Sequence, residues 1–181
     1  MPEQLADSTR PEEGPGSLTT GAPKRASESA TEMVQVVLPN DANPLGYILG
    51  GTVMHLIDIA GAIACHRHTR SLLVTAAVDG LQFLHPIKVG DLIILKARVT
   101  AAWTTSLEVE VEVFSEETLT GVRRMTSSAY LTFVAIDRDN RRIPIPGLIL
   151  ETAEEKGKAA DADRRRAERL KARKDLESRS R

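Results

Sequence analysis

The segment from 50 to 68, GGTVMHLIDIAGAIACHRH, constrains the fold more than any other part of the sequence. Its apolar residues fall on nearly every side of a helix, so a helix over about 52 to 68 must be buried all round. A carboxylate, Asp58, nevertheless lies in its middle. A sheet covers such a helix only by curling around it, and another subunit must cover the rest.

The remainder of the chain supplies strands for such a sheet. A short strand-like run begins near Met33, and four longer runs follow the helix. One of these, TSLEVEVEVFSE, alternates apolar residues with glutamates, and Asp79-Gly80 predicts a β-bulge in another. The order of one strand, one buried helix and four antiparallel strands predicts an α+β architecture, in which an antiparallel sheet wraps one long central helix.

Composition divides the chain into three parts. Residues 1–30 hold few large apolar side chains and are rich in small, turn-forming and charged residues, which predicts a disordered segment. A single domain is expected over 31–150, because the chain of 181 residues is 41% hydrophobic and can build a core. Residues 151–181 form a charged tail that we expect to be helical, with the basic stretch DRRRAERLKARK.

Charge and composition argue against several classes of partner. The formal net charge of -1 offers no general attraction to nucleic acid or membranes, and 3% aromatic residues provide no stacking platform for single strands. Acidic residues beside the basic stretch favour a solvated helix edge. The single cysteine, Cys65, excludes an internal disulfide and is expected in the core. Without a membrane span or signal peptide, we expect a cytoplasmic protein.

The residues alone leave two interpretations of Asp58 open. It is either a hydrogen-bonded structural residue, or a carboxylate placed among apolar neighbours to act as a base or nucleophile. Gly50 and Gly51 directly precede the predicted helix, where free N–H groups favour a developing oxyanion. Together these groups form a site for attack on a carbonyl. Gly61, on the same helix face, indicates a close approach by a partner helix or a ligand.

Three stretches of the chain are similar to a known family. They are LPNDANPLGYILGGTVMHLIDIAGAIACHRH, VTAAVDGLQFLHPIKVGDLIILKARVTAAWTTSLEVEVEVF and SAYLTFVAIDRDNRRIPIP. Roughly residues 33–150 thereby resemble hotdog-fold acyl-CoA thioesterases, in the acyl-CoA hydrolase group that includes brain acyl-CoA hydrolase and its single-domain bacterial relatives. The resemblance implies hydrolysis of an acyl-CoA thioester to free acid and coenzyme A, without a cofactor. It also implies a homo-oligomer of dimers, commonly a trimer of dimers.

The resemblance assigns roles to individual residues. Asp58 corresponds to the catalytic carboxylate of the family's central helix, as general base or as nucleophile. The family's loop asparagine falls at Asn43, which would serve the Asp58 of a partner subunit. The oxyanion contact, a backbone amide at the start of the helix, falls at Gly50 or Gly51.

Coenzyme A contacts follow from the same resemblance. Where family members often carry G-R-T-S before the alternating strand, this chain has WTTS, so the usual arginine is absent. Trp103 either covers part of coenzyme A or simply packs. The candidate contacts are Thr104, Thr105, Ser106, Arg123 and Arg124.

Other functions also stay open. A hotdog module that binds acyl-CoA without turnover is disfavoured because Asn43 and Asp58 are both present. A hydratase or dehydratase would need a paired histidine arrangement that this chain does not display. A third possibility is that the tail assembles partners. His66 and His68 end the predicted helix, and their spacing with Asp58 offers no metal site with three ligands on one face.

Overall fold

The structure is a computed structural model that describes residues 21–179 of the chain. In chain order its elements are β1 Lys24–Arg25, the 3-10 helix η1 Ala26–Ser29, β2 Thr31–Val36, the 3-10 helix η2 Pro39–Asp41, α1 Gly50–Thr69, β3 Leu72–Phe83, β4 Leu92–Ala102, β5 Ser106–Glu116, β6 Arg123–Ile136, β7 Leu148–Ile149 and α2 Ala153–Arg179. The predicted strands and both helices are therefore present. No helix within the described range has the length and apolar composition that a membrane crossing requires.

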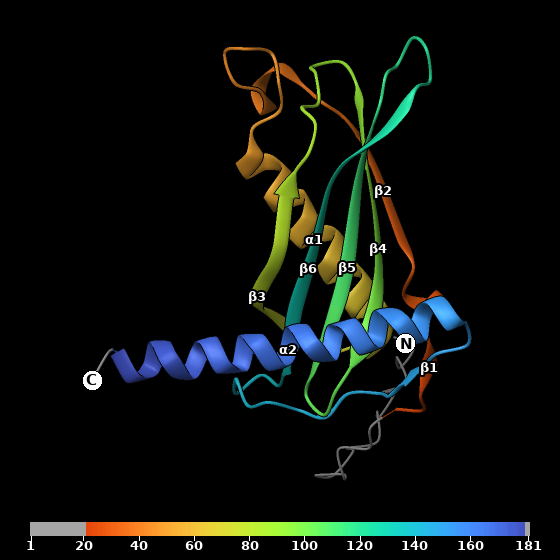
Figure 1. Ribbon diagram of the computed structural model, residues 1–181. Coiled ribbons are helices and arrows are strands. Elements are labelled where there is room, and N and C mark those ends of the chain that lie inside the picture. The colour runs from red at the N-terminus through yellow and green to blue at the C-terminus, as the bar shows by residue number, and fades with distance from the viewer. Residues whose placement is uncertain (1–20, 180–181) are drawn as a thin grey trace, which may run out of the picture.

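Five antiparallel strands form the main sheet, in the order β2-β4-β5-β6-β3. The long helix α1 lies along one face of this sheet and α2 crosses the other (Figure 1). The alternation in β5 has the predicted consequence: Leu107, Val109, Val111 and Val113 are all fully buried in the core. This arrangement confirms the α+β hotdog fold. The predicted bulge is also present, as a register shift between Asp79 and Gln82.

The α1 helix packs directly on the sheet at Gly61. A Cβ atom at this position would lie 3.1 Å from Val109 Cγ1 and 3.2 Å from the ring of Phe133. Both neighbours belong to the core. The close approach expected from the sequence is therefore made by the chain's own sheet, and not by a partner helix or a ligand.

Order begins earlier in the chain than the sequence predicts. Within the described part of the N-terminal segment, β1 pairs in parallel with β7, and Ala26 and Ser29 of η1 are buried. Ser29 Oγ accepts a hydrogen bond of 3.0 Å from the N–H of Val99, 70 residues away. The expectation of disorder is thus wrong for residues 24–29, because contacts distant in sequence order a segment of unpromising composition. Residues 1–20 lie outside the described range.

The α2 helix begins at a capping box. Thr152 Oγ1 accepts a hydrogen bond from the N–H of Glu155, and Glu155 Oε2 accepts one from the N–H of Thr152, each at 3.1 Å. Further along, Lys158 and Arg169 pair with Glu110 and Asp79 on the outer face of the sheet.

Arg165 makes the most deeply buried of these contacts. It forms two hydrogen bonds, of 3.1 and 2.7 Å, with Glu108, whose side chain is 0% exposed. Two cations of the basic stretch, Arg165 and Arg169, therefore neutralise carboxylates of β5 and β3, and in these two positions the stretch is not the solvated edge that its composition favours.

Candidate active site

Asp58 lies between α1 and the edge strand β3. Thr75 Oγ1, on β3, donates a hydrogen bond of 2.7 Å to Asp58 Oδ1. The Asp58 side chain is half-buried, and among residues 21–179 no cation forms an ion pair with it. A neutral donor thus fixes one carboxylate oxygen, which leaves the other available to a proton or a carbonyl carbon.

The surroundings of Asp58 are less enclosed than the sequence suggests. Met54, one turn earlier on α1, is 47% exposed, and Val74 and Val78 of the neighbouring strand are 44% and 47% exposed. The side of α1 next to β3 is therefore uncovered, although its sequence is apolar. An exposed apolar surface of this kind beside an edge strand is typical of a surface that another subunit covers.

Gly50 and Gly51 belong to the first turn of α1 and do not precede it. The first intrahelical hydrogen bond runs from the N–H of Val53 to the carbonyl of Leu49, at 3.1 Å. The earlier N–H groups of the helix have no intrahelical acceptor and point out of its positive end. At 1.5 Å per residue these amides lie about 11 Å along the axis from Asp58, so they and Asp58 of one chain cannot hold one carbonyl group together.

Asn43 lies in the loop that leads into α1. Its Oδ1 accepts hydrogen bonds from the N–H groups of Leu45 and Tyr47, at 3.0 and 3.3 Å, which fixes the side chain on its own loop. Its amide NH₂ has no acceptor among the described residues and remains able to donate. The structure shows no contact between Asn43 and Asp58 of the same chain.

The candidate coenzyme A contacts lie at opposite ends of the sheet. Thr104, Thr105 and Ser106 are at the turn between β4 and β5, whereas Arg123 and Arg124 begin β6 after the next hairpin. The 11 residues of β5 separate the two groups, a length of about 35 Å. One chain therefore does not bring all five residues to one ligand.

The two arginines differ in their partners. Arg123 binds Glu116 through Nε and a terminal nitrogen, at 3.0 and 2.7 Å. Arg124 instead lines a pocket of about 300 Å³ with Tyr47, His85 and Lys88. Of the pair, Arg124 is thus the one placed to contact a ligand.

Trp103 is held by the tail helix. Its Nε1 donates a hydrogen bond of 2.9 Å to Asp163, and the guanidinium carbon of Arg166 lies 4.6 Å from the ring centroid. Of the two roles considered from the sequence, the structure therefore shows packing, and one face of the indole carries a guanidinium.

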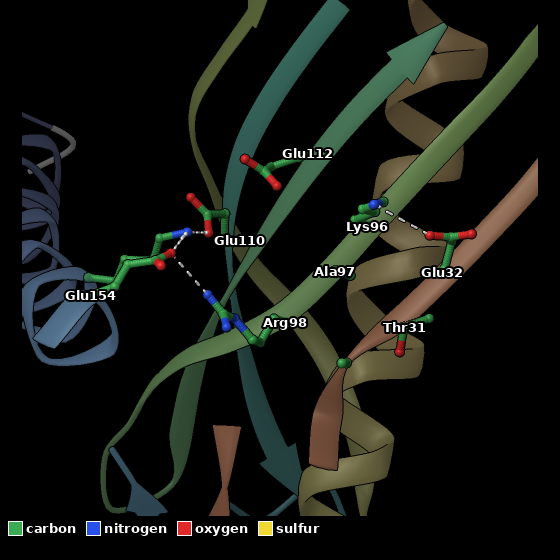
Figure 2. Close-up of a pocket in the computed structure, with 10 residues that line it drawn as sticks. Thr31, Glu32, Lys96, Ala97, Arg98, Glu110, Glu112 and Glu154 are labelled. Atoms are coloured by element: carbon green, nitrogen blue, oxygen red, sulfur yellow. Dashed lines mark hydrogen bonds and ion pairs between the residues drawn. The ribbon is translucent and has the colours of Figure 1, made fainter. Parts of the chain in front are cut away.

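A second hollow, of about 420 Å³, lies on the outer face of the sheet (Figure 2). Cations and carboxylates meet across it: Lys96 pairs with Glu32 at 3.6 Å, and Arg98 with Glu154 at 3.4 Å. This hollow is separate from Asp58, because α1 packs on the opposite face. The pairs of Arg98 with Glu154 and of Lys158 with Glu110 fasten α2 to the sheet there.

The remaining titratable candidates have structural positions. Cys65 is fully buried, and burial raises the pKa of its thiol, so it is no nucleophile. His68 Nε2 donates to the carbonyl of Pro146 at 2.9 Å, and His66 Nδ1 lies 2.9 Å from the carbonyl of Ser71. Across residues 21–179 no group of three or more His, Cys, Asp and Glu side chains could hold a metal ion.

Comparisons with known proteins identify the family. A family model described as "Thioesterase superfamily" matches residues 45–122. Over 138 residues the chain is 36% identical to an uncharacterized acyl-CoA thioester hydrolase of Bacillus subtilis, YkhA, covering 76% of this chain and 80% of that protein. The chain belongs to the thioesterase superfamily. It is also 32% identical over 136 residues to the human cytosolic acyl coenzyme A thioester hydrolase, covering 74% of this chain and 36% of that protein.

Solved structures of the superfamily agree with the fold. A hexameric apo acyl-CoA thioesterase is 37% identical, with a TM-score of 0.80 over 83% of this chain and 97% of that one. An acyl-CoA hydrolase from Staphylococcus aureus, solved with butyryl coenzyme A, coenzyme A and coenzyme A disulfide, is 33% identical, with a TM-score of 0.77 over 87% and 99%. Variants of the latter with an Asp, an Asn or a Thr replaced by Ala have also been solved.

Thr75 is the one site residue that the sequence does not reveal. It lies in an apolar strand, 17 residues from Asp58, and no spacing rule connects a helix with the strand that follows it. The available indication is a hydroxyl residue in the run LLVTAAVDG, where the other positions before Asp79 are apolar. That indication is too weak to identify Thr75 before the contact between α1 and β3 is known.

Proposed function

We propose that this thioesterase superfamily protein hydrolyses acyl-CoA thioesters to a free acid and coenzyme A. The Asp58 carboxylate, oriented by Thr75 on the uncovered side of α1, is the observation that carries the proposal. As general base, Asp58 takes a proton from water while the water oxygen attacks the thioester carbon. The tetrahedral intermediate then expels the thiolate as its C–S bond breaks, and the thiolate takes the proton back from Asp58. Direct attack by Asp58, giving an anhydride, uses the same position.

Each site in this proposal is built from two subunits. The separation of about 11 Å along α1 means that the Gly50 and Gly51 amides complete the site of a different chain. Asn43, whose NH₂ group has no acceptor among the described residues of its own chain, accompanies them. Asn43 and Gly50 or Gly51 of the partner subunit then hold the carbonyl oxygen that Asp58 acts upon.

The edge strand β3 is the proposed surface for pairing two copies. It ends the sheet, and its large exposed apolar side chains include Leu72, at 53%, and Phe83, also at 53%. Pairing two edges buries these side chains and satisfies the free backbone groups of both strands. A trimer of such dimers accords with the hexameric relative.

Coenzyme A contacts are proposed at both ends of the sheet. Arg123 and Arg124 lie at one end, where Arg124 is the better candidate because Glu116 already holds Arg123. The turn at Thr104, Thr105 and Ser106 provides hydroxyl groups at the other end. We further propose a cytoplasmic location, supported by a single buried, unpaired cysteine in the described residues.

Thiol release from short, medium and long acyl-CoAs tests the function. We expect hydrolysis by the parent protein, and a kcat for Asp58→Asn that is lower by about 100-fold or more, with an unchanged oligomer on gel filtration. Asp175→Asn, at an exposed position of α2, is the matched control and should keep full activity. Binding of acyl-CoA without thiol release would identify a binding module, and an active Asp58→Asn would remove Asp58 from the chemistry.

A further inference from the structure

The α2 helix is longer than the sheet that it crosses. Its 27 residues extend about 40 Å, whereas the five strands of the main sheet, spaced about 4.8 Å apart, cover about 20 Å. Lys158 and Arg165 of α2 bind carboxylates of β5. Arg169, further along the helix, binds Asp79 of β3. Because β3 is an edge strand, α2 continues past the sheet after Arg169 (Figure 1).

The part of α2 beyond the sheet, residues 170–179, is the projecting segment. Each of its residues is exposed, whereas Ala162 on the covered part of the helix is fully buried. The projecting segment extends about 15 Å from the edge of the sheet. Helical segments of this length are held in water mainly by the packing of one face. A surface that packs on the projecting segment would therefore stabilise it.

The side of α2 that faces the sheet continues into the projecting segment. Residues on this side recur at intervals of four, three and four, as Lys158, Ala162, Arg165 and Arg169. The same spacing leads next to Ala172 and Leu176. The Leu176 side chain is 64% exposed. Two apolar residues thus occupy the positions at which earlier turns of the helix contact the sheet.

A hollow of about 470 Å³ lies at the junction of α2 with the edge of the sheet. Its lining includes Asp79 and Gly80 of β3, and Arg169 and Ala172 of α2. A second β3 strand, paired with the first, lies about 4.8 Å beyond it, and the next strand of that second sheet lies about 4.8 Å further. Measured from Arg169, Ala172 and Leu176 lie about 4.5 and 10.5 Å along α2. They therefore lie over the first two strands of a paired sheet.

Pairing about a two-fold axis also brings two α2 helices side by side. The midpoint of β3, Leu72–Phe83, falls between positions 77 and 78, and Asp79, which binds α2, lies just past it. With the axis at this midpoint, the two Asp79 residues are about three residues, or about 10 Å, apart along the strands. Packed helices have axes about 8–10 Å apart. Antiparallel contact between the two α2 helices thus fits the pairing of the edges.

Leu170 lies on the side of α2 that faces the second helix. Arg166, four residues earlier, stacks on Trp103 of the β4–β5 turn, at the end of the sheet where β3 begins. Because Asp79 is past the middle of β3, the second α2 lies toward that same end. Leu170 is 47% exposed there. Among the described residues Arg166 has no carboxylate partner, so in an antiparallel pair centred near Leu170 it can bind Glu177 of the other helix.

We propose that the projecting segment of α2 docks on a second copy of this chain. Ala172 and Leu176 pack on the outer face of the partner's sheet, and the two Leu170 side chains meet where the α2 helices cross the joined edges. The docking rests on the β3 pairing proposed above and extends it to the face of the sheet opposite Asp58. Because each active site in that pairing needs both subunits, the two α2 helices hold the sites together from outside.

Sedimentation velocity over a dilution series tests the docking. For Leu170→Glu and Leu176→Glu we expect the dissociation constant of the oligomer to rise about 10- to 100-fold, because each change places a charge where an apolar side chain is buried in the oligomer. Ala167→Glu is the matched control and should dissociate like the parent protein. Ala167 is exposed and lies two residues from both Arg165 and Arg169, on the side of α2 away from the sheet.

Cross-linking tests the same contact without relying on affinity. A bismaleimide about 10 Å long should join two chains of Leu170→Cys, and should leave Ala167→Cys as single chains on a denaturing gel. The native thiol of Cys65 is fully buried, so it does not compete for the reagent. The docking is overturned if Leu176→Glu dissociates no more readily than the parent protein, or if Leu170→Cys cross-links no more than Ala167→Cys.

Thiol release by the same samples separates this inference from the proposed function. An inactive parent protein whose Leu176→Glu variant dissociates more readily, and whose Leu170→Cys variant cross-links, keeps the docking and rejects the hydrolase. A parent protein that releases thiol, with an oligomer unchanged by the α2 variants, keeps the hydrolase and rejects the docking. A monomeric parent protein rejects the docking together with the β3 pairing on which it rests.

Discussion

At the scale of single residues, the hydrogen bond from Thr75 to Asp58 decides which oxygen of the carboxylate is free to react. The donor is neutral, and among the described residues no cation is paired with Asp58. An adjacent ammonium or guanidinium group would stabilise the charged carboxylate and weaken it as a base or nucleophile. The site instead orients the carboxylate through a hydroxyl group, which fixes geometry without adding charge.

Removing that hydroxyl should slow the reaction without abolishing it. Thr75→Val keeps the shape and β-propensity of the side chain but loses the 2.7 Å hydrogen bond. We expect kcat to fall about 10-fold while KM changes little, because the bond orients a reacting group. Thr75→Ser, which restores a hydroxyl, should recover most of the rate in steady-state assays. Equal kcat values for Thr75→Val and the parent protein would contradict the positioning role.

At the scale of elements, both helices are fastened by polar contacts with residues distant in sequence. At the end of α1, His68 is fully buried and donates from Nε2 to Pro146, while its Nδ1 has no partner in the described structure. At the other helix, Arg165 reaches the buried carboxylate of Glu108. The His68 contact joins α1 to the segment after β6, and the Arg165 contact joins α2 to β5 of the central sheet.

Acid should destabilise the fold through His68. Burial lowers the pKa of His68 in the folded protein below its ordinary value of 6.5. The unfolded chain therefore binds the proton more readily, and the free energy of unfolding should decrease as the pH falls through about 6.5. Urea titrations between pH 7.5 and 5 should show a smaller pH dependence for His68→Gln than for the parent protein. His66→Gln, at an exposed position, is the control, and an unchanged dependence in His68→Gln would contradict this assignment.

Breaking the Arg165 contact should be costly. Arg165→Met leaves the carboxylate of Glu108 buried without its cation, for which we expect a loss of about 3 kcal/mol in the free energy of unfolding. Adding Glu108→Gln should recover much of that loss, because the uncompensated charge disappears. Arg164→Met, which removes a surface pair, should change stability by less than about 1 kcal/mol. Urea denaturation measures all three, and a loss for Arg165→Met as small as that for Arg164→Met would show that the buried pair contributes little.

At the scale of the whole molecule, one chain holds two separated halves of the proposed site. Asp58 lies near the middle of α1 and is bound by Thr75 of β3, whereas the amides of Gly50 and Gly51 lie at the beginning of α1 and the loop of Asn43 precedes it. Two copies related by a two-fold axis bring each half to the complementary half of the other chain. A dimer then has two equivalent sites.

Mixed oligomers test this arrangement directly. Asn43→Asp keeps the Oδ1 that holds its own loop but removes the NH₂ donor, and Asp58→Ala removes the carboxylate. If each site uses two chains, co-expressing the two inactive variants places one intact site in every mixed dimer. Random mixing should then restore about a quarter of the parent activity in thiol-release assays. If both groups act within one chain, every site in the mixture is defective and no activity returns.

The sequence predicts the elements of this fold better than their contacts. Periodicity alone identifies α1 and the four long strands, because the core faces impose it. The docking of α2 could not be predicted, because Arg165 and Glu108 are 57 residues apart. Each of them lies in a charged stretch that looks like a solvent-exposed surface. Thr75 escapes for a related reason: its role depends on how α1 lies against β3. The structure was therefore needed for the contacts between elements, because the residues that make them look polar or unremarkable in the sequence.

Gly61 limits how this family member can diverge. It lies one turn after Asp58, where a Cβ atom would lie 3.1 Å from Val109 Cγ1 and 3.2 Å from the ring of Phe133. Because both neighbours belong to the packed core, alanine would require them or α1 to move by a few tenths of an ångström, which changes how Asp58 lies against Thr75. Descendants of this chain are therefore free to alter the surface around the site, but the spacing between helix and sheet is inherited unchanged, and any new substrate must be accommodated by the other walls.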